Sequence, residues 1–427
     1  MTTSVALPHG QAVAPRLSVM MVLEFLIWGG WYVHVGNYMG AHGMSDQIAM
    51  VYSLCPVAAI ISPFFLGMVA DRFFATEKVL GLLSLLGGVF LLLVPMLAPS
   101  GKPSLFIGLL FLHTLCFMPT LGLTSSLTFH HVTDQEKQFP VIRVFGTIGW
   151  IAANWIVSKW LHGDKTAVQF WVAGGASVLL GLYSFSLPHT PPPSEGKKAK
   201  ARDILGLDAL ALLKRPTIAI FIICSLLICI PLAFYYAYAA VFVDAVGITD
   251  PAFKMSFGQI GEIFFMLMMP MLFARLGVKY MLLAGMVAWV ARYGLFAAAA
   301  NSHAVWMVIG GIILHGICYD FFFVSGQIYI DKRASPKIRG QAQGFLVLIT
   351  QGAGMLIGAQ TAGWIFKTQK VGENVDWHML WLIPCIAAAV IAAVFLALFR
   401  DDSNEPAIEI EEYPDSAHSP SSVAKPA

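Results

Sequence analysis

Five ionisable side chains stand inside long apolar stretches of the sequence. They are Glu24, Arg143, Glu262, Arg292 and Asp320. A charge at the centre of a bilayer costs about 2.5–3.5 kcal/mol on insertion scales, so such residues usually face the interior of a helix bundle and mark a pathway for a substrate or an ion. We therefore expect Glu262 and Asp320 to bind a ligand or a proton.

Polar residues near these acids share helical faces with one another. Gln259 lies three residues before Glu262, so an amide and a carboxylate can be presented to one ligand. His315 and Tyr319 are four residues apart and lie on one face of another predicted helix. Asp320 is about 100° further round that helix, so its side chain is expected to point toward a neighbouring helix.

A second set of aligned residues brings aromatic rings near a charge. Trp28 follows Glu24 by four residues, and Thr147 follows Arg143 by four. Trp150 lies about one helical turn after Thr147. Aromatic faces suit planar ligands, although tryptophans at membrane depth also serve as packing or interface anchors. Arg143 is near the end of its apolar stretch and could instead extend its guanidinium to the membrane surface. Ligand contact and these structural roles are both open from the residues alone.

The composition assigns the chain to the membrane. Its 427 residues are 58% hydrophobic and 12% charged, and that charged fraction is about half the value usual in soluble proteins. The formal net charge of +2 and the scattering of basic residues over short loops give no surface for nucleic acid. No metal site is predicted, because the six cysteines lie in apolar stretches without metal-ligand spacing. The first apolar stretch is too long for a cleaved signal peptide.

The apolar stretches have the length of membrane-spanning helices. About 20 apolar residues cross the hydrocarbon core, and backbone groups in lipid must be paired within each segment, which favours helices over open strands. We predict twelve spans, near residues 17–39, 47–70, 79–98, 104–127, 142–161, 168–187, 216–241, 252–274, 280–299, 304–330, 341–366 and 378–399. A polar stretch in the middle of the chain divides them into two sets of six.

Positive charge predicts the orientation of these helices. With both termini cytoplasmic, the inner segments hold 19 of the 26 Lys and Arg residues and the outer loops hold 6, in agreement with the positive charge of cytoplasmic loops. The chain then consists of a cytoplasmic N-terminus (1–16), two six-helix bundles (17–187 and 216–399), a basic cytoplasmic linker with a short helix (188–215) and an acidic tail (400–427). The tail is too polar to bury a core and is expected to be disordered.

The two halves contain similar motifs at equivalent positions. Residues 67–72 (GMVADR) follow the second span and residues 275–279 (RLGVK) follow the eighth. Two six-helix bundles related by a repeat are typical of transporters that bind their substrate between the halves, near the membrane midplane. The sequence therefore predicts an all-α integral membrane protein with the major facilitator fold. Arg292 would then lie outside the ring of helices around the cavity, where we expect a structural role.

Six stretches of the chain together are specific for one family. They are Met118–Leu123 (MPTLGL), Phe139–Gly149 (FPVIRVFGTIG), Leu205–Ala209 (LGLDA), Gln259–Glu262 (QIGE), Tyr319–Phe322 (YDFF) and Ile338–Gly344 (IRGQAQG). On these residues the chain, from about Leu17 to Arg400, resembles the nucleoside:proton symporters of the major facilitator superfamily. The resemblance implies a proton-driven importer of nucleosides in a bacterial inner membrane.

The resemblance also implies roles for individual residues. The family's polar contacts correspond to Arg143, Thr147, Gln259 and Glu262, its aromatic position to Tyr319 and its buried acid to Asp320. The substrate-binding residues are expected to be Trp28, Arg143, Thr147, Trp150, Tyr236, Gln259, Glu262, His315 and Tyr319. The proton-coupling residue is expected to be Asp320 or Glu262.

Four positions depart from the family pattern. Ala233 and Tyr236 replace a glutamine and an asparagine, His315 replaces a tyrosine, and Trp150 replaces a phenylalanine. These changes remove amide hydrogen bonds and add ring surface. They indicate a divergent branch of the family.

We expect a monomeric secondary transporter, surrounded by lipid, that imports a nucleoside by proton symport through alternating access. The proton is the coupling ion and no other cofactor is expected. A sugar or related polar metabolite is the alternative substrate, because Trp28, Trp31, Tyr235 and Tyr236 would also stack on a pyranose. The sequence has no soluble signalling domain and no HExxH or GxSxG motif, which argues against a membrane sensor or an enzyme.

Overall fold

The first half of the chain forms one set of helices. The computed structural model describes residues 9–65, 74–97, 102–192, 207–335, 338–372, 374–403 and 405–406. The elements of the first half are α1 (His9–Tyr32), α2 (Val35–Ala41), the 3₁₀ helix η1 (Ser45–Gln47), α3 (Ile48–Phe65), α5 (Thr76–Leu97), α6 (Pro103–His131), α7 (Gln135–Asn154), the π-helix η3 (Trp155–Trp160) and α8 (Val168–Ser184).

The second half is also helical, apart from one short hairpin. Its elements are the 3₁₀ helix η4 (Leu207–Lys214), α10 (Pro216–Ala245), α11 (Pro251–Ser302), α12 (Val305–Ile313), α13 (His315–Tyr319), the π-helix η5 (Asp320–Val324), α14 (Ser325–Arg333), α15 (Arg339–Val347), the π-helix η6 (Leu348–Gly354), α16 (Met355–Thr368), β1 (Lys370–Val371), β2 (Asn374–Val375) and α17 (Trp377–Leu398). The two strands pair antiparallel and were not expected from the sequence, because two residues are too few to show an alternating pattern.

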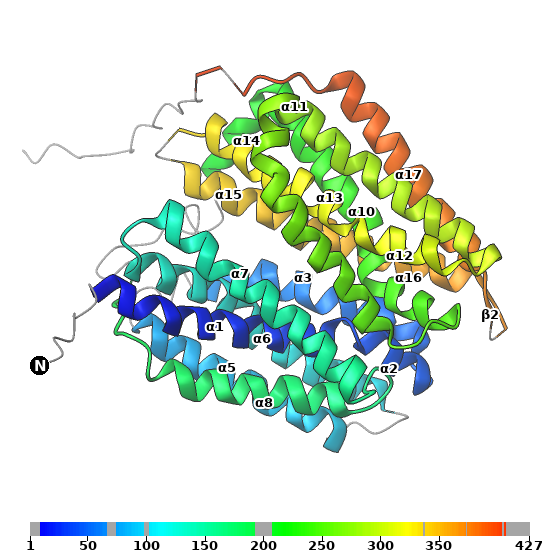
Figure 1. Ribbon diagram of the computed structural model, residues 1–427, viewed down its shortest axis with the longest axis horizontal. Helices are drawn as coiled ribbons and strands as arrows, with labels where there is room; N and C mark the ends of the chain where they lie inside the picture. Colours follow the sequence, from blue (N-terminus) through cyan, green and yellow to red (C-terminus); the bar gives the residue numbers. More distant parts are fainter. Residues whose placement is uncertain are drawn as a thin grey trace, which may run out of the picture.

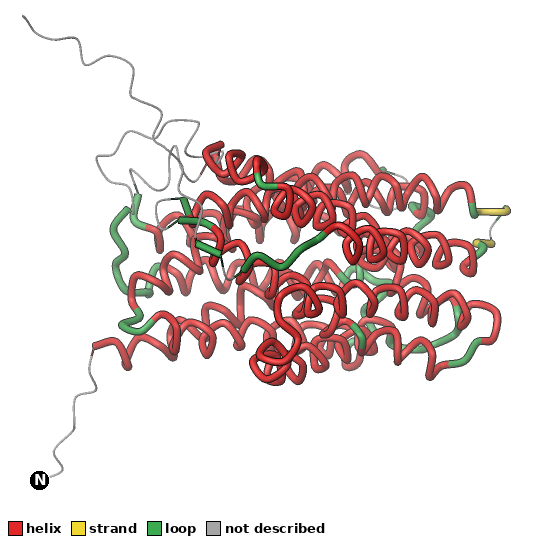
Figure 2. Tube along the Cα trace, turned by 90° about the horizontal axis from the view of Figure 1, so that it is seen from above, coloured by secondary structure: helices red, strands yellow, loops and turns green. Residues whose placement is uncertain are grey.

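The helices gather into two bundles. Figure 1 shows α1, α5, α6, α7 and α8 in one bundle and the helices from α10 to α17 in a second bundle beside it. Most helices run along the long axis of the molecule in both views (Figures 1 and 2). The bundles meet where α3 packs against α16 and where α7 packs against α11. The predicted all-α architecture is confirmed.

The helices have the lengths expected of membrane spans. Ten helical segments of the described residues are long and apolar enough to cross a membrane, and Val168–Ser184 is a shorter apolar helix. In α11 two helices meet at Gly277, whose φ of +68° is a conformation that glycine adopts without steric cost. Dividing α11 there and counting α8 gives twelve segments, one for each predicted span.

Several details differ from the sequence-based expectation. The first predicted span is interrupted between α1 and α2, and the tenth and eleventh contain the π-helical turns η5 and η6. Residues 207–214 of the predicted linker form η4, and residues 193–206 lie outside the described residues. The motif at residues 67–72 and the tail from residue 407 onward lie outside them as well.

Glycines let α1 and α7 approach closely. A Cβ atom at Gly29 would lie 3.1 Å from the carbonyl oxygen of Trp150, and one at Gly149 would overlap the carbonyl oxygen of Val22. Both contacts are with backbone atoms, which cannot move aside as a flexible side chain can. The helices α1 and α7 carry the predicted site residues of the first bundle. They can pack this closely because Gly29 and Gly149 have no side chains.

We predict that Gly149→Ala destabilises the protein by about 1–3 kcal/mol, the usual cost of overpacking. Gly175→Ala is the matched control, because a Cβ atom at Gly175 meets nothing within 4 Å. Thermal unfolding of the purified proteins in detergent should show a lower Tm for the first variant only. Equal Tm values for the two variants would contradict close packing of α1 on α7.

Candidate functional site

A cavity lies between the two bundles, near the middle of the helices that line it. It encloses about 720 Å³ free of protein atoms, including solvent at its mouth. Its walls are formed by Phe25, Trp28, Tyr32, Arg143, Thr147, Trp150, Tyr236, Gln259, Glu262, His315, Tyr319, Gln351 and Met355. All nine residues predicted to bind substrate are among them.

The first bundle contributes an aromatic wall and a cation. Trp28 makes edge-to-face contacts with Trp150, at 5.5 Å between ring centroids, and with Tyr32, at 5.8 Å. The guanidinium carbon of Arg143 lies 4.0 Å from the centroid of the Phe25 ring, a cation–π distance. Arg143 has no ion-pair partner within the described ranges. Its N–H groups are therefore available to a ligand.

The second bundle contributes polar groups from α11 and α13. Gln259 and Glu262 face the cavity from α11, and His315 and Tyr319 face it from α13. A Cβ atom at Gly316 would lie 2.6 Å from the backbone nitrogen of Glu262, so this glycine permits the close approach of the two helices. Gln259 Oε1 and His315 Nδ1 have no hydrogen-bond partner among the described residues. The wall thus presents unpaired donors and acceptors.

Aromatic rings connect the two walls. Tyr32 and Tyr236 approach from opposite bundles with ring centroids 5.8 Å apart. His315 stacks on Tyr235 at 5.2 Å and 15°, and the guanidinium carbon of the buried Arg292 lies 4.1 Å from the centroid of the same tyrosine ring. Arg292 packs against the Tyr235 ring, and the same ring stacks on His315. This contact agrees with the structural role expected for Arg292.

The two predicted proton-coupling acids occupy different places. Glu262 lines the cavity. Asp320 is the first residue of η5, has 0% exposure and does not line the cavity, as its position on the helix indicated. Neither of its carboxyl oxygens has a hydrogen-bond partner in the part of the chain that the structure describes. Asp320 is therefore a buried acid behind the wall rather than a ligand contact.

Four residues of the cavity wall were not predicted. They are Phe25, Tyr32, Gln351 and Met355. Gln351 lies in the π-helix η6, and such turns often occur at functional sites because they widen the helix locally. Gln351 could have been predicted as a site residue because it is a glutamine inside an apolar stretch.

A second cavity continues from the first toward the end of the molecule where α1 begins. It shares Phe25, Trp28, Arg143, Tyr319 and Gln351 with the first cavity, and further residues of α1, α6, η5, α14, α15 and η6 complete its lining. The first cavity therefore has a path toward the end of the molecule where α1 begins (Figure 1).

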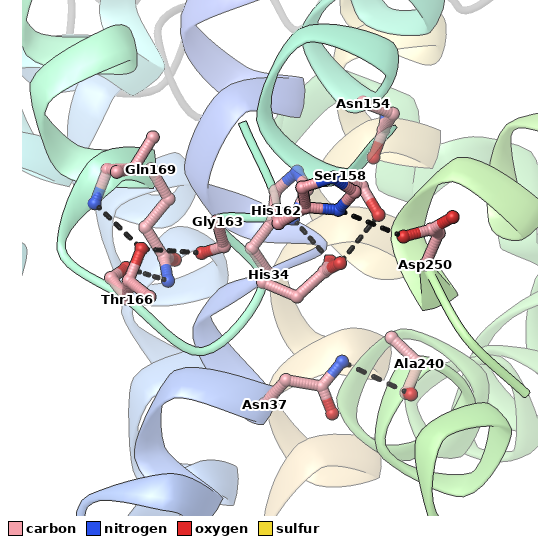
Figure 3. Close-up of polar contacts among 12 residues, drawn as sticks. His34, Asn37, Asn154, Ser158, His162, Gly163, Thr166, Gln169, Ala240 and Asp250 are labelled. Carbon is pink, nitrogen blue, oxygen red and sulfur yellow. Dashed lines mark hydrogen bonds and ion pairs between the residues drawn. The ribbon is translucent and has the colours of Figure 1, made fainter. Parts of the chain in front are cut away.

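The opposite end is joined by ion pairs between the bundles. The nitrogen–oxygen distances are 2.9 Å for Lys159–Asp250, 2.8 Å for Lys165–Asp244 and 3.0 Å for Lys370–Asp46. Asn37 Nδ2 also donates across the interface to the carbonyl oxygen of Ala240, at 3.2 Å (Figure 3). These contacts join the two bundles on that side.

A buried polar cluster that includes His34 and Ser158 lies in the same region as Asn37 and Asp250 (Figure 3). His34 Nδ1 lies 2.9 Å from Asp164 Oδ1, and Ser158 Oγ donates to Asp164 Oδ2 at 2.6 Å. Burial acts to raise the pKa of Asp164, but the hydrogen bonds from His34 and Ser158 outweigh it and hold this pKa below its usual value. Asp164 therefore remains ionised and joins the loop between η3 and α8 to the turn between α1 and α2.

The family model described as nucleoside H⁺ symporter matches residues 11–404. The chain belongs to the nucleoside H⁺ symporter family. Membership confirms the predicted fold and proton-coupled nucleoside import, with the proton as the coupling ion. It also makes the chain a multi-pass membrane transporter.

Relatives of the chain match it over nearly its whole length. The protein YegT of Escherichia coli (strain K12) is 37% identical over 413 residues, which are 93% of this chain and 96% of YegT. The xanthosine permease of the same organism is 31% identical over 91% of this chain and 96% of its own length. A crystal structure of the nucleoside transporter NupG superposes with a TM-score of 0.80 at 29% identity, covering 91% of this chain and 99% of that chain.

We predict that Asp164→Asn lowers the stability of the protein by about 1.5–3 kcal/mol, the usual contribution of hydrogen bonds to a charged group. Because the folded-state pKa of Asp164 is lowered, this stabilisation is complete above the usual pKa of aspartate, about 3.9, and is lost as the pH falls through the folded-state value. Thermal unfolding from pH 8 to pH 5 should therefore show a difference from wild type throughout.

Asp331→Asn is the control for this prediction. Asp331 forms an exposed pair with Arg339, and exposed pairs contribute little. A Tm for Asp164→Asn equal to that of this control would show that the buried cluster does not stabilise the fold.

Proposed function

We propose that the chain imports nucleosides into a bacterial cell by proton symport and binds them in the cavity between the bundles. The observation that carries this proposal is the composition of the cavity wall, where aromatic rings stand beside unpaired donors and acceptors. A nucleoside needs both, because its base is a flat ring and its ribose and base edges are polar. Stacking of a base on an aromatic ring contributes about 1–3 kcal/mol.

The wall residues suggest a division of roles. Trp28, Trp150 and Tyr236 supply ring surface for the base. Arg143 supplies donors in a planar fork, and Glu262 supplies acceptors for ribose hydroxyls. Thr147, Gln259, His315 and Tyr319 complete the polar contacts.

The conformation is proposed to be inward-facing. The charge bias of the loops favours cytoplasmic termini, so the ion-paired end of the molecule would be outside and the second cavity would open to the cytoplasm. Transport would proceed by rocking of the bundle at 17–187 against the bundle at 216–399. The location would be the inner membrane of a bacterium, with lipid around a monomer that has no enzymatic activity.

Proton entry would drive accumulation of the substrate. One proton moving down about 100 mV supplies about 2.3 kcal/mol, and one pH unit adds about 1.4 kcal/mol. Together the potential and the pH difference support a substrate concentration ratio of roughly several hundred. A single coupled carboxylate is sufficient, and either Asp320 or Glu262 is the proposed carrier, because both are acids held at membrane depth beside or behind the cavity.

We predict that proteoliposomes containing the purified protein accumulate labelled uridine or adenosine only when a proton gradient is imposed. Unlabelled nucleosides should compete with this uptake and free hexoses should not. Competition by a hexose at least equal to that by nucleosides would instead support the sugar alternative, which the same aromatic rings allow.

We predict that Asp320→Asn abolishes accumulation driven by the proton gradient. The substitution keeps the shape of the side chain and removes its titration. Exchange of labelled for unlabelled nucleoside at equal pH is the second measurement, and it should persist if the variant is folded. A variant that still concentrates substrate to the wild-type level would exclude Asp320 as the coupling residue.

A further inference from the structure

Glu24 is a fully buried carboxyl group outside the cavity wall. It lies on α1 one turn before Trp28, its exposure is 0%, and it does not line the cavity. The charged form of an acid at this depth is costly unless neighbouring groups replace its hydration. Its neighbours therefore decide which form it takes.

The hydrogen bonds of Thr120 indicate the form of Glu24 in this conformation. Thr120 Oγ lies 2.6 Å from Glu24 Oε1 and 2.6 Å from the carbonyl oxygen of Phe117. A hydroxyl group carries one hydrogen, and neither a carbonyl nor a carboxylate carries any. The hydroxyl can share its single hydrogen between the two acceptors. Each contact has a hydrogen of its own only when Glu24 is protonated, so that Glu24 donates to Thr120 and Thr120 donates to the carbonyl oxygen of Phe117.

The same threonine can also serve the ionised form. If Glu24 loses its proton, rotation of the Thr120 hydroxyl turns its hydrogen toward the carboxylate without moving a heavy atom. The other carboxyl oxygen, Glu24 Oε2, has no hydrogen-bond partner among the described residues, so the ionised form is less well satisfied here. The site thus accepts both forms and favours the protonated one in the inward-facing conformation.

Glu24 is coupled electrically to the substrate cavity through Arg143. The charge of Arg143 acts on Glu24 of the first bundle and on Glu262 of the second, and the Tyr319 hydroxyl is the other titratable group facing Arg143. In the described ranges, Arg143 is also the charged group that acts on Glu24. Ionised Glu24 would attract this cation toward α1, whereas protonated Glu24 leaves it to the substrate and to Glu262.

The path for a proton from Glu24 to the second cavity is short. Thr124, one turn along α6 from Thr120, lines the second cavity. Thr124 Oγ donates to the carbonyl oxygen of Thr120 at 3.0 Å, and both side chains are buried. A proton passing from Glu24 therefore needs to cross about one helical turn, roughly 5.4 Å along α6, to reach the second cavity.

We propose that Glu24 carries a second transported proton, in addition to the one assigned to Asp320 or Glu262. The inference rests on the proposed function. A proton from the outside binds the carboxylate of Glu24 in the outward-facing conformation and travels as the carboxyl O–H. It leaves to water in the second cavity, which returns the carboxylate, so only an O–H bond forms and breaks. Glu24 is on α1 of the first bundle and Asp320 is in η5 of the second.

The test is the number of protons moved per nucleoside in proteoliposomes, measured from the pH gradient that balances a fixed nucleoside gradient. Glu24→Gln should reduce this number by one. The accumulation ratio should then fall by about tenfold for each pH unit imposed, while nucleoside exchange at equal pH continues. Glu24→Asp, which still titrates, should keep the wild-type proton number.

Glu77→Gln is the matched control, because Glu77 is a buried acid of the same bundle that bonds His189 and Thr190 away from the cavity. It should keep the wild-type proton number. An unchanged proton number in Glu24→Gln would overturn the proposal. Loss of nucleoside exchange in Glu24→Gln with exchange retained in Glu24→Asp would also overturn it, because the carboxyl group would then be needed for movement of the nucleoside itself. Failure of the wild-type protein to couple protons to nucleosides would instead overturn the proposed function itself.

Discussion

Charged side chains can remain at membrane depth only where protein groups or water replace their hydration, and the arrangement of the two bundles follows from this constraint. Arg143 lies over the ring of Phe25 and Arg292 over the ring of Tyr235. These faces stabilise a cation without neutralising it. The acids lie between or behind the same walls. The cavity is thus the place where both bundles turn their polar groups away from lipid.

Close packing of the helices makes this arrangement possible. At Gly149 and Gly316, a Cβ atom would meet the backbone of the neighbouring helix. The first contact joins α1 to α7 and the second joins α11 to α13. In each wall of the cavity, a glycine therefore allows two helices to pack closely. The side chains that face the cavity are positioned by helices that have little freedom to separate. Binding and stability are therefore linked in this fold.

Much of the site could be predicted from the sequence, because a polar residue in an apolar stretch is conspicuous and helical spacing assigns it to a face. Arg143 and Glu262 were found in this way. Gln351 was missed because the π-turn that presents it leaves no periodic signal. The contact of His34 with Asp164 joins residues 130 positions apart, and only the folded chain brings them together. The distances and directions of hydrogen bonds likewise cannot be predicted from the spacing of residues along the sequence.

Nucleoside and proton are proposed to move together through the cavity. The most direct measurement uses proteoliposomes that contain the purified protein and a pH-sensitive dye, with potassium and valinomycin present to prevent charge from building up. Uridine or adenosine is added outside without an imposed pH gradient. We expect the lumen to become acidic as the nucleoside enters. Entry of the nucleoside with no change in luminal pH would contradict it.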